Sequence, residues 1–449
     1  MMEHAHSFSV ESAINKVSKL TFLLQQQRDV PLWAITNEHL IYAIAVGENV
    51  YRGPRQNILY FIIKLAYKIK ISDLVILACG LFVILTIWFG AKKQKNIKVT
   101  KINRIFACCG CLSDKKIYSD YLTRAKDEPL KINWITKEGL SALELPTLYR
   151  LVFQLMKQSI GHTKKLENSI QDISAHVLDF LTTGAVNIGD YIFYREYWEQ
   201  AIKVGATELS ILVPSVQAFA AVDVGLRTIF LQHGLLVRGI LMPQFTRIEA
   251  LTLEEVSYFR KILPKASVYK CSGQVQGNPL PKKDVILCLS VNLVTKMLGE
   301  YIEIWHEVNH WAKMVGLSVV IRPTPNVKTQ EIEYLKKQFP EAVFDDLNDT
   351  MESSLEKWQP KFVIAWRSTG LVTALEHGYL PIMLHSNESC LYIWNLIYPM
   401  KERFLFWNKD ADKIADALQS TSKYNEIITQ LNPSRTTEMI KHSESNVAI

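Results

Sequence analysis

The chain lacks several features that would assign it to a well-defined class. Its seven cysteines are too scattered for a disulfide framework, and no C-x-x-C pair is repeated, so we expect reduced thiols in a cytosolic compartment. No dense run of lysine and arginine with interleaved aromatic residues is present, so we expect no nucleic-acid partner. The N-terminus is polar and the first long apolar run lies far from it, which argues against a secretory signal.

The composition that remains is that of a globular protein. Hydrophobic residues make up 48% of the chain and charged residues 21%, which excludes wholesale disorder. A length of 449 residues allows two or three domains. The net charge of +7 is modest for this length.

One apolar stretch, residues 74–91, contains no charged residue. At about 1.5 Å per residue it is just long enough to cross a bilayer, so we predict one transmembrane helix over residues 74–91, with a buried core helix as the alternative. Basic residues flank both ends and give a slight preference for a cytoplasmic body. Residues 56–71 are apolar with Lys64 and Lys68 one turn apart, which fits either a helix flat on an anionic leaflet or one arm of a hairpin.

From about residue 98, strand and helix patterns alternate, which predicts an α/β fold with two Rossmann-like domains. Residues 272–283 are rich in Gly, Pro and polar residues and read as the joint between them. We therefore predict an N-terminal helical membrane region (1–97), a first Rossmann-like domain (98–275), a second (284–432) and a flexible tail (433–449). The predicted strands are 102–108, 130–135, 209–213, 228–231, 285–289, 317–322, 342–344, 362–366 and 380–384, and the predicted helices are 12–27, 33–46, 145–157, 169–180, 191–203, 293–314 and 330–338.

Three polar loops follow predicted parallel strands, at residues 231–234, 321–326 and 367–370. Ligands of open α/β sheets bind outside the carboxyl ends of the strands, so we expect these loops to face one crevice between the domains. A histidine, an arginine and a helix N-terminus suit a diphosphate leaving group. The alternative is an ordinary βαβ unit in which Ser368 and Thr369 only cap a helix.

The order of these segments resembles bacterial surface-carbohydrate glycosyltransferases of the capsule, teichoic-acid polymerase and polysialyltransferase type. The segments YREYWEQAIKVGATELSILVPS and VGLRTIFLQHG resemble their acceptor half. The segments DVILCLSVN, VVIRPTPN and STG…ALEHGYLPIML resemble their nucleotide-binding half. The resemblance covers roughly residues 98–430. It implies a GT-B fold and a membrane-associated enzyme of capsule polysaccharide biosynthesis, which moves a sugar from a nucleotide-sugar donor to a glycan or lipid-linked acceptor without a metal ion or other cofactor.

The resemblance also implies roles for individual residues. His233 and Arg322 would contact the donor diphosphate, and the turn at residues 368–370 would bind its phosphates. This chain has Thr324 where such families usually carry a histidine, and Thr373 where they often carry a ribose-binding glutamate. The residues predicted to bind the donor are His233, Gly234, Arg322, Ser368, Thr369, Gly370 and Thr373.

Asp114, in the loop after the first strand, is the best-placed general base for an inverting transfer, and His233 is the second predicted catalytic residue. An ordinary solvated turn residue is the alternative reading of Asp114. We expect the enzyme at the cytoplasmic (inner) membrane, with its catalytic body on the cytoplasmic side.

Two other functions remain open. His306-Glu307-x-x-His310 matches the zinc metallopeptidase signature, in which two histidines one helical turn apart bind zinc. Its position on a helix between two strands of an α/β unit argues against that reading. Because of Thr324 and Thr373, a non-catalytic relative with the same fold is the other alternative.

Overall fold

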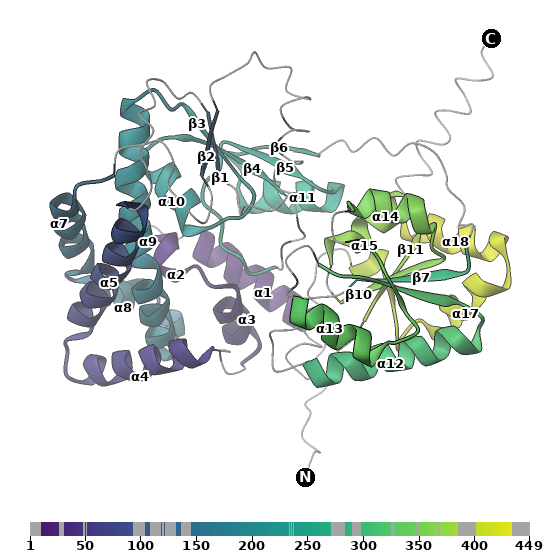
Figure 1. Ribbon diagram of the computed structural model, residues 1–449. Coiled ribbons are helices and arrows are strands. Elements are labelled where there is room, and N and C mark those ends of the chain that lie inside the picture. The colour runs from purple at the N-terminus through teal and green to yellow at the C-terminus, as the bar shows by residue number, and fades with distance from the viewer. Residues whose placement is uncertain are drawn as a thin grey trace. The chain divides into compact units, whose positions relative to one another are not determined.

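The computed structural model forms two compact units, Met1–Cys271 and Ser272–Ile449, and each is described by itself (Figure 1). Both units contain a parallel sheet with helices packed against it, which confirms the predicted α/β class. The structure describes residues 10–26, 31–47, 50, 52–92, 104–107, 118, 121, 132–135, 145–232, 234, 236, 238–270, 283–289, 298–324, 327, 329–346, 349–366, 368–384 and 401–432.

The first unit combines the N-terminal helices with a six-stranded parallel sheet in the order β2-β1-β3-β4-β5-β6. Its strands are β1 (Arg104–Ala107), β2 (Ile132–Ile135), β3 (Glu208–Ile211), β4 (Arg227–Leu231), β5 (Arg247–Ala250) and β6 (Ser267–Lys270). Its helices are α1 (Val10–Gln25), α2 (Leu32–Ile35), α3 (Glu38–Val46), α4 (Pro54–Lys68), α5 (Ser72–Lys92), α7 (Leu148–Ser159), α8 (His162–Ser169), the 3-10 helix η1 (Gln171–His176), α9 (Val177–Lys203), α10 (Val216–Asp223) and α11 (Leu253–Ile262).

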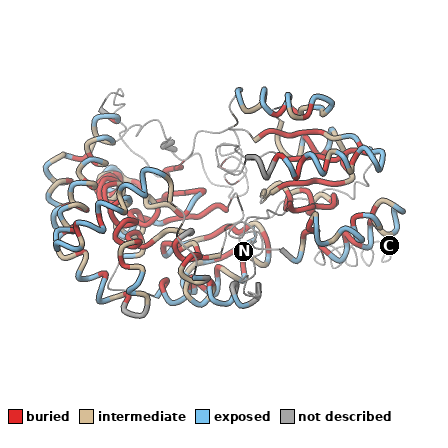
Figure 2. Tube along the Cα trace, turned by 90° about the horizontal axis from the view of Figure 1, so that it is seen from below, coloured by how far each residue is buried: buried red, intermediate tan, exposed pale blue. Residues whose placement is uncertain are grey.

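One hydrophobic core unites these elements, because buried residues of the N-terminal helices and of the strands belong to the same cluster. The helix α9 lies at its centre and packs against α5, α10, α2 and α4. Figure 2 shows the central strands of the two sheets, such as β3, β7 (Val285–Leu289) and β10 (Phe362–Ala365), in the buried colour, while the outer helices alternate between buried and exposed residues.

The prediction of two separate helices over residues 169–180 and 191–203 is wrong. The 3-10 helix η1 is followed by one continuous helix, α9, which includes Gly184 and Gly189. A Cβ atom on Gly189 would lie 2.8 Å from the carbonyl oxygen of Gly80 and 2.6 Å from the Cβ of Val83, both in α5. Gly189 therefore allows α5 to pack closely on α9, and it does not interrupt the helix.

The predicted helix over residues 33–46 is two helices, α2 and α3. Asn37 separates them, and its side-chain Oδ1 accepts a hydrogen bond from the Leu40 amide at 3.2 Å. This local bond satisfies an amide at the start of α3, which favours a new helix start over continuation. The apolar stretch 74–91 is helical, as predicted, and forms most of α5.

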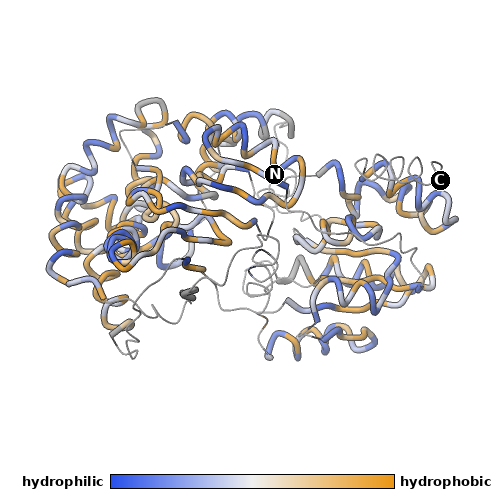
Figure 3. The backbone as a smooth tube through the Cα atoms, turned by 90° about the horizontal axis from the view of Figure 1, so that it is seen from above, coloured by the Kyte–Doolittle hydropathy of each residue, from blue (hydrophilic) through white to orange (hydrophobic). Residues whose placement is uncertain are grey.

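The second unit contains a parallel sheet in the order β12-β11-β10-β7-β8-β9. Its buried strands are rich in Val, Ile and Leu because both faces of a parallel sheet are covered, and in Figure 3 they are mostly in the hydrophobic colour. Its strands are β7 (Val285–Leu289), β8 (Ser318–Arg322), β9 (Val343–Phe344), β10 (Phe362–Ala365), β11 (Leu380–Met383) and β12 (Leu405–Phe406). Its helices are α12 (Leu298–Met314), α13 (Thr329–Gln338), α14 (Met351–Trp358), α15 (Thr369–Glu376), the 3-10 helix η2 (Lys401–Arg403), α17 (Ala411–Gln419) and α18 (Thr421–Leu431).

Candidate functional site

The order of strands in the second sheet reverses between β7 and β10. From β7 the chain builds β8 and β9 on one side, and β10, β11 and β12 later fill the other. Leu289, the last residue of β7, pairs with Arg322 in β8 and with Ala365 in β10. The loops after β8 and β10 therefore leave the same edge of one sheet, at the position where open α/β folds bind ligands. Two of the three predicted loops are thus brought together.

The turn after β10 starts α15 directly at this edge. Ser368 is the N-cap residue, and its Oγ accepts a hydrogen bond from the Gly370 amide at 3.1 Å. The Leu371 amide donates to the Ser368 carbonyl oxygen at 3.0 Å. Two amides in the first turn of α15 are therefore already satisfied by Ser368, as the capping interpretation of this turn expects. A phosphate that used these amides would have to replace the Ser368 bonds.

Gly370 leaves room for the Leu289 side chain where α15 meets β7. A Cβ atom at this position would lie 2.5 Å from Cδ1 of Leu289, the residue at the end of β7. The absence of a side chain lets the first turn of α15 approach the reversal point of the sheet. The positive end of the helix dipole is thereby placed at the carboxyl edge.

Thr373, which replaces the glutamate of the resembling families, lies one turn further along α15. Its Oγ1 is 3.5 Å from the Thr369 carbonyl oxygen. Its own carbonyl oxygen accepts a hydrogen bond from Nδ1 of His377 at 2.8 Å. The hydroxyl of Thr373 thus turns back toward its own helix, and its contact with a ribose stays a prediction.

Arg322, at the end of β8, is buried, and its described hydrogen bonds stay within the second unit. Its guanidinium donates to Oδ2 of Asp345 at 3.0 Å, to the hydroxyl of Ser354, and to the carbonyl oxygen of Asp349 at 2.5 Å. Asp345 follows β9, and Ser354 lies in α14. Arg322 therefore ties α14 to the carboxyl edge of the sheet.

Asp345 is the acceptor at the centre of this network, and sequence reasoning missed it. Its buried carboxylate also accepts hydrogen bonds from Nζ of Lys357 at 3.1 Å and from Nε1 of Trp358 at 2.7 Å. Burial raises the pKa of Asp345, but hydrogen bonds from Ser354, Trp358, Lys357 and Arg322 outweigh burial and lower the pKa to about 2. The available signal was an aspartate immediately after a strand, which is common in turns and therefore weak.

In the first unit the loop after β4 is fixed by Gln232. Its Nε2 donates to the Gly234 carbonyl oxygen at 3.0 Å, and its Oε1 accepts from the Leu251 amide at 3.1 Å. The side chain is buried and connects Gly234 to the backbone that follows β5. His233 itself and Asp114 lie outside the described residues, and their roles stay predictions.

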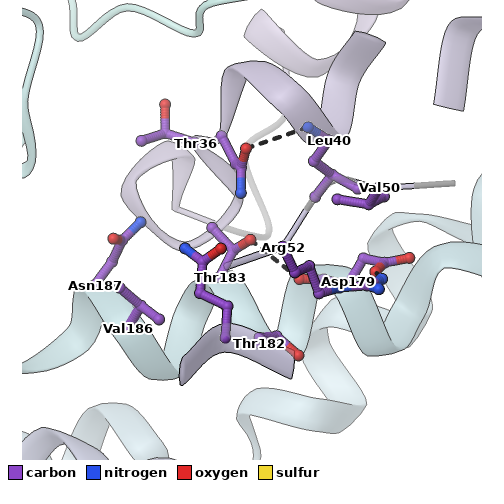
Figure 4. Close-up of a pocket in the computed structure, with 11 residues that line it drawn as sticks. Thr36, Leu40, Val50, Arg52, Asp179, Thr182, Thr183, Val186 and Asn187 are labelled. Atoms are coloured by element: carbon purple, nitrogen blue, oxygen red, sulfur yellow. Dashed lines mark hydrogen bonds and ion pairs between the residues drawn. The ribbon is translucent and has the colours of Figure 1, made fainter. Parts of the chain in front are cut away.

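A polar pocket of about 100 Å³ lies between α2–α3, the start of α4 and α9 (Figure 4). Arg52 forms an ion pair with Asp179 in its lining and stacks over the ring of Tyr60, with the guanidinium carbon 3.8 Å from the ring centroid. Burial lowers the pKa of Arg52 against a smaller opposing effect of Tyr60. Burial and then the charge of Arg52 lower the pKa of His176, whose Nδ1 lies 3.4 Å from Oδ2 of Asp179. No local sequence pattern connects Arg52 with Asp179.

The H-E-x-x-H residues lie on the outer side of α12. His306, Glu307 and His310 are exposed, and His306 lies 3.4 Å from Oε1 of Gln338 with its ring centroid 4.7 Å from that of Phe339. Among the residues that the structure describes, no group of three His, Cys, Asp or Glu side chains is placed to hold a metal ion. The helix therefore offers no third zinc ligand within the described part of the chain.

Comparisons with known proteins give only distant structural similarity. No family model and no curated protein matches the chain. The spinosyn rhamnosyltransferase SpnG complexed with thymidine diphosphate aligns at 10% identity and a TM-score of 0.38, covering 74% of this chain and 91% of that one. The apo structure of OtsA aligns at 10% identity and a TM-score of 0.41 (74% and 94%), and MurG of Acinetobacter baumannii at 10% and 0.34 (76% and 99%). TM-scores below 0.5 do not establish a common fold, so the argument for function depends on the chain itself.

Proposed function

We propose that this chain is a glycosyltransferase with a GT-B-like pair of domains. In this proposal it moves a sugar from a nucleotide-sugar donor to a glycan or lipid-linked acceptor in the synthesis of a surface polysaccharide such as a capsule. The observation that carries the proposal is the start of α15 at the β7/β10 reversal point, where Gly370 lets a helix N-terminus reach the edge of the sheet. A helix N-terminus at such a point suits a diphosphate.

The proposed donor site uses the first turn of α15. The donor diphosphate would accept hydrogen bonds from the hydroxyls of Ser368 and Thr369 and from the amide of Gly370, with Thr373 next to the ribose. Because the described hydrogen bonds of Arg322 go to Asp345, Ser354 and Asp349, we assign Arg322 a positioning role at the sheet edge.

Isothermal titration calorimetry with CMP-, CDP-, UDP-, GDP- and dTDP-sugars tests the proposal. We expect saturable binding of one nucleotide class to the full chain. Heat changes indistinguishable from dilution across the whole panel contradict it. Binding without sugar transfer to any glycan or lipid-linked acceptor supports the alternative of a non-catalytic relative with a retained donor site.

Ser368→Ala is expected to weaken donor binding by at least ~10-fold, because it removes a charge-assisted hydrogen bond to phosphate worth roughly 1.5–3 kcal/mol. The matched control is Ser420→Ala, because Ser420 is the N-cap of α18 and its Oγ accepts from the Lys423 amide at 3.2 Å. Each change removes one helix cap and costs about 1 kcal/mol of stability. Equal donor affinity in both variants contradicts the phosphate role of Ser368.

Asp114→Asn is expected to lower kcat by about 10²–10⁴ with unchanged donor affinity, because an amide cannot accept the proton of the acceptor hydroxyl. His233→Ala is expected to abolish transfer while the fold is retained. Both are measured by product formation at saturating donor, with circular dichroism as the folding control. Full activity of Asp114→Asn removes Asp114 as the base.

The proposal places the protein at the cytoplasmic membrane with its catalytic body on the cytoplasmic side. Residues 72–91 of α5 have a mean hydropathy of 2.6 and are long and apolar enough to cross a membrane, a test that core helices of soluble proteins also pass. Recovery of the native protein in the membrane fraction of its source cells supports this location. Recovery only in the soluble fraction contradicts it.

A further inference from the structure

The helix α4 exposes an apolar stripe on the side opposite its packed face. Ile63 and Ala66 are buried, and the helix contacts α9 and α5. The outer stripe follows helical spacing and includes Phe61, 68% exposed, and Leu65, 57% exposed. The exposed apolar residues of α4 and of the turn after it are Ile58, Phe61, Ile62, Leu65, Ile69 and Ile71. A helix apolar on both faces needs a second apolar surface to cover the outer one.

The neighbouring helices α5 and α7 also expose large apolar residues. The helix α5 contacts both α4 and α7, and the three lie together at one end of the first unit in Figure 1. Phe82 of α5 is 73% exposed and Phe153 of α7 is 64% exposed. The exposed large apolar residues of these two helices and of the residue that follows α7 are Leu74, Phe82, Phe89, Tyr149, Phe153, Met156 and Ile160.

Charges around this surface are predominantly positive. The three helices contain a single acidic residue, Asp73, and its carboxylate accepts hydrogen bonds from the amides of Gly161 at 2.7 Å and Thr163 at 3.0 Å. The exposed basic residues described on the three helices, on the turn after α4 and on the adjoining α8 are Arg55, Lys64, Lys68, Lys70, Lys157, Lys164 and Lys165, with Glu167 as the exposed acidic residue of α8. An apolar stripe bordered by lysines is complementary to the interface of an anionic leaflet.

The packing of α5 argues against a position across the bilayer. It packs closely on α9 at Gly80, near the middle of α5, because Gly189 of α9 lies against Gly80 and Val83. The next residue of α9 is Asp190, and α9 also contains the buried Glu196. If α5 crossed the membrane in this arrangement, α9 would enter with it and place Asp190 near the bilayer centre, which is strongly unfavourable.

We propose that α4, α5 and α7 form a monotopic docking surface that lies in one leaflet of a membrane containing anionic lipid. The outer stripes contact the acyl region, the lysines contact the headgroups, and α5 does not cross the bilayer. The inference deepens the membrane part of the proposed function and is independent of sugar transfer.

Vesicle flotation of the full chain tests the surface. Vesicles of phosphatidylcholine are compared with vesicles that also contain phosphatidylglycerol. We expect the wild type to bind the anionic vesicles at least ~10-fold more tightly, since each lysine near an anionic surface contributes roughly fivefold. The double variant Phe61→Glu with Leu65→Glu is expected to lose binding to both vesicles, and Lys64→Glu with Lys68→Glu to lose the preference for anionic lipid.

The matched control is Met314→Glu, because Met314 is 66% exposed on α12 of the second unit and lies outside the surface. We expect this variant to bind vesicles as the wild type does. All four altered side chains of the α4 variants are exposed, so thermal unfolding is expected to be unchanged in each protein. Absence of wild-type flotation, or equal loss in Met314→Glu, overturns the inference. If the wild type self-associates but does not bind vesicles, and Phe61→Glu with Leu65→Glu disrupts the self-association, then the surface binds a second copy of the chain instead.

A second measurement separates docking from spanning. Cysteines are introduced at Lys68, before α5, and at Gly90, near its end, where a Cβ atom would have no heavy atom within 4 Å. An impermeant maleimide is added outside sealed vesicles, and labelling of each site is read by peptide mass spectrometry. Labelling at both sites supports docking, while labelling at only one end shows that α5 spans. Donor binding measured in parallel keeps this result separate from the test of the proposed function.

Discussion

Replacing Asp345 with alanine is expected to lower the free energy of unfolding of the second unit by about 3–5 kcal/mol, because it leaves the buried Arg322 without its carboxylate partner. The change also removes the acceptor for Nε1 of Trp358 and for the hydroxyl of Ser354. Denaturant-dependent hydrogen exchange, read peptide by peptide, measures this loss in the second unit alone.

The control is Asp284→Ala in the same unit. Asp284 is exposed and lies 3.6 Å from Nζ of Lys361, a surface ion pair worth about 0–1 kcal/mol. If both variants lost a similar, small amount of unfolding free energy, then water could replace the carboxylate of Asp345 at little cost. That result would also leave the guanidinium of Arg322 available to a ligand.

The contribution of Asp345 is expected to depend on pH. Its folded pKa of about 2 is below the ordinary value of about 3.9 for aspartate, so the unfolded state binds more protons between these values. The stabilisation is therefore complete above about pH 4 and is lost as the pH falls toward about 2. The difference between wild type and Asp345→Ala should shrink over this window, whereas a constant difference contradicts the ionised network.

Gly189→Ala is expected to destabilise the first unit by about 1–3 kcal/mol, because the new methyl group has no space at the crossing of α9 with α5. It would meet the carbonyl oxygen of Gly80 at 2.8 Å, and a backbone atom cannot move aside as a flexible side chain does. The steric cost is larger than the gain of about 1 kcal/mol in helix propensity when glycine is replaced by alanine, so the net change is destabilising. Thermal unfolding by circular dichroism and hydrogen exchange in α5 and α9 both report it.

Gly90→Ala is the matched control, because Gly90 also lies within a helix and its surroundings are open. Here only the propensity gain remains, so unchanged or higher stability is expected. If Gly189→Ala were as stable as Gly90→Ala, then α5 would not be packed on α9. The argument against a spanning α5 would then fail as well.

Five of the six strands of the second unit were predictable because each lies in a short, mostly apolar run between polar loops. The predicted strand 285–289 coincides with β7, and the other predicted strands of this unit overlap β8, β9, β10 and β11. The short strands β5, β6 and β12 and the helices α8, α11, α14, α17 and α18 were not predicted, because their patterns are too short to stand out from neighbouring loops. The α/β class followed from alternation alone.

The site was predictable only in part. Strand ends are visible in sequence, so the loops after β8 and β10 were located correctly, and their common edge follows from parallel pairing to β7. The partners of Arg322 were not visible, because Ser354 is 32 residues away and becomes a neighbour only when α14 packs on the sheet. Likewise, the Gly370 amide already donates a hydrogen bond to Oγ of Ser368, and this bond competes with the phosphate binding that the same two residues suggest.

The sequence by itself determined that the chain has two α/β units, that α5 is apolar and that a helix begins after Ser368. These properties depend on residues close in the chain, whose spacing fixes hydrogen bonding and the side that is buried. Only the tertiary structure decided that Arg322 is committed to Asp345 and that α5 packs on α9 through Gly80 and Gly189. These facts depend on contacts between distant segments, which local spacing does not encode.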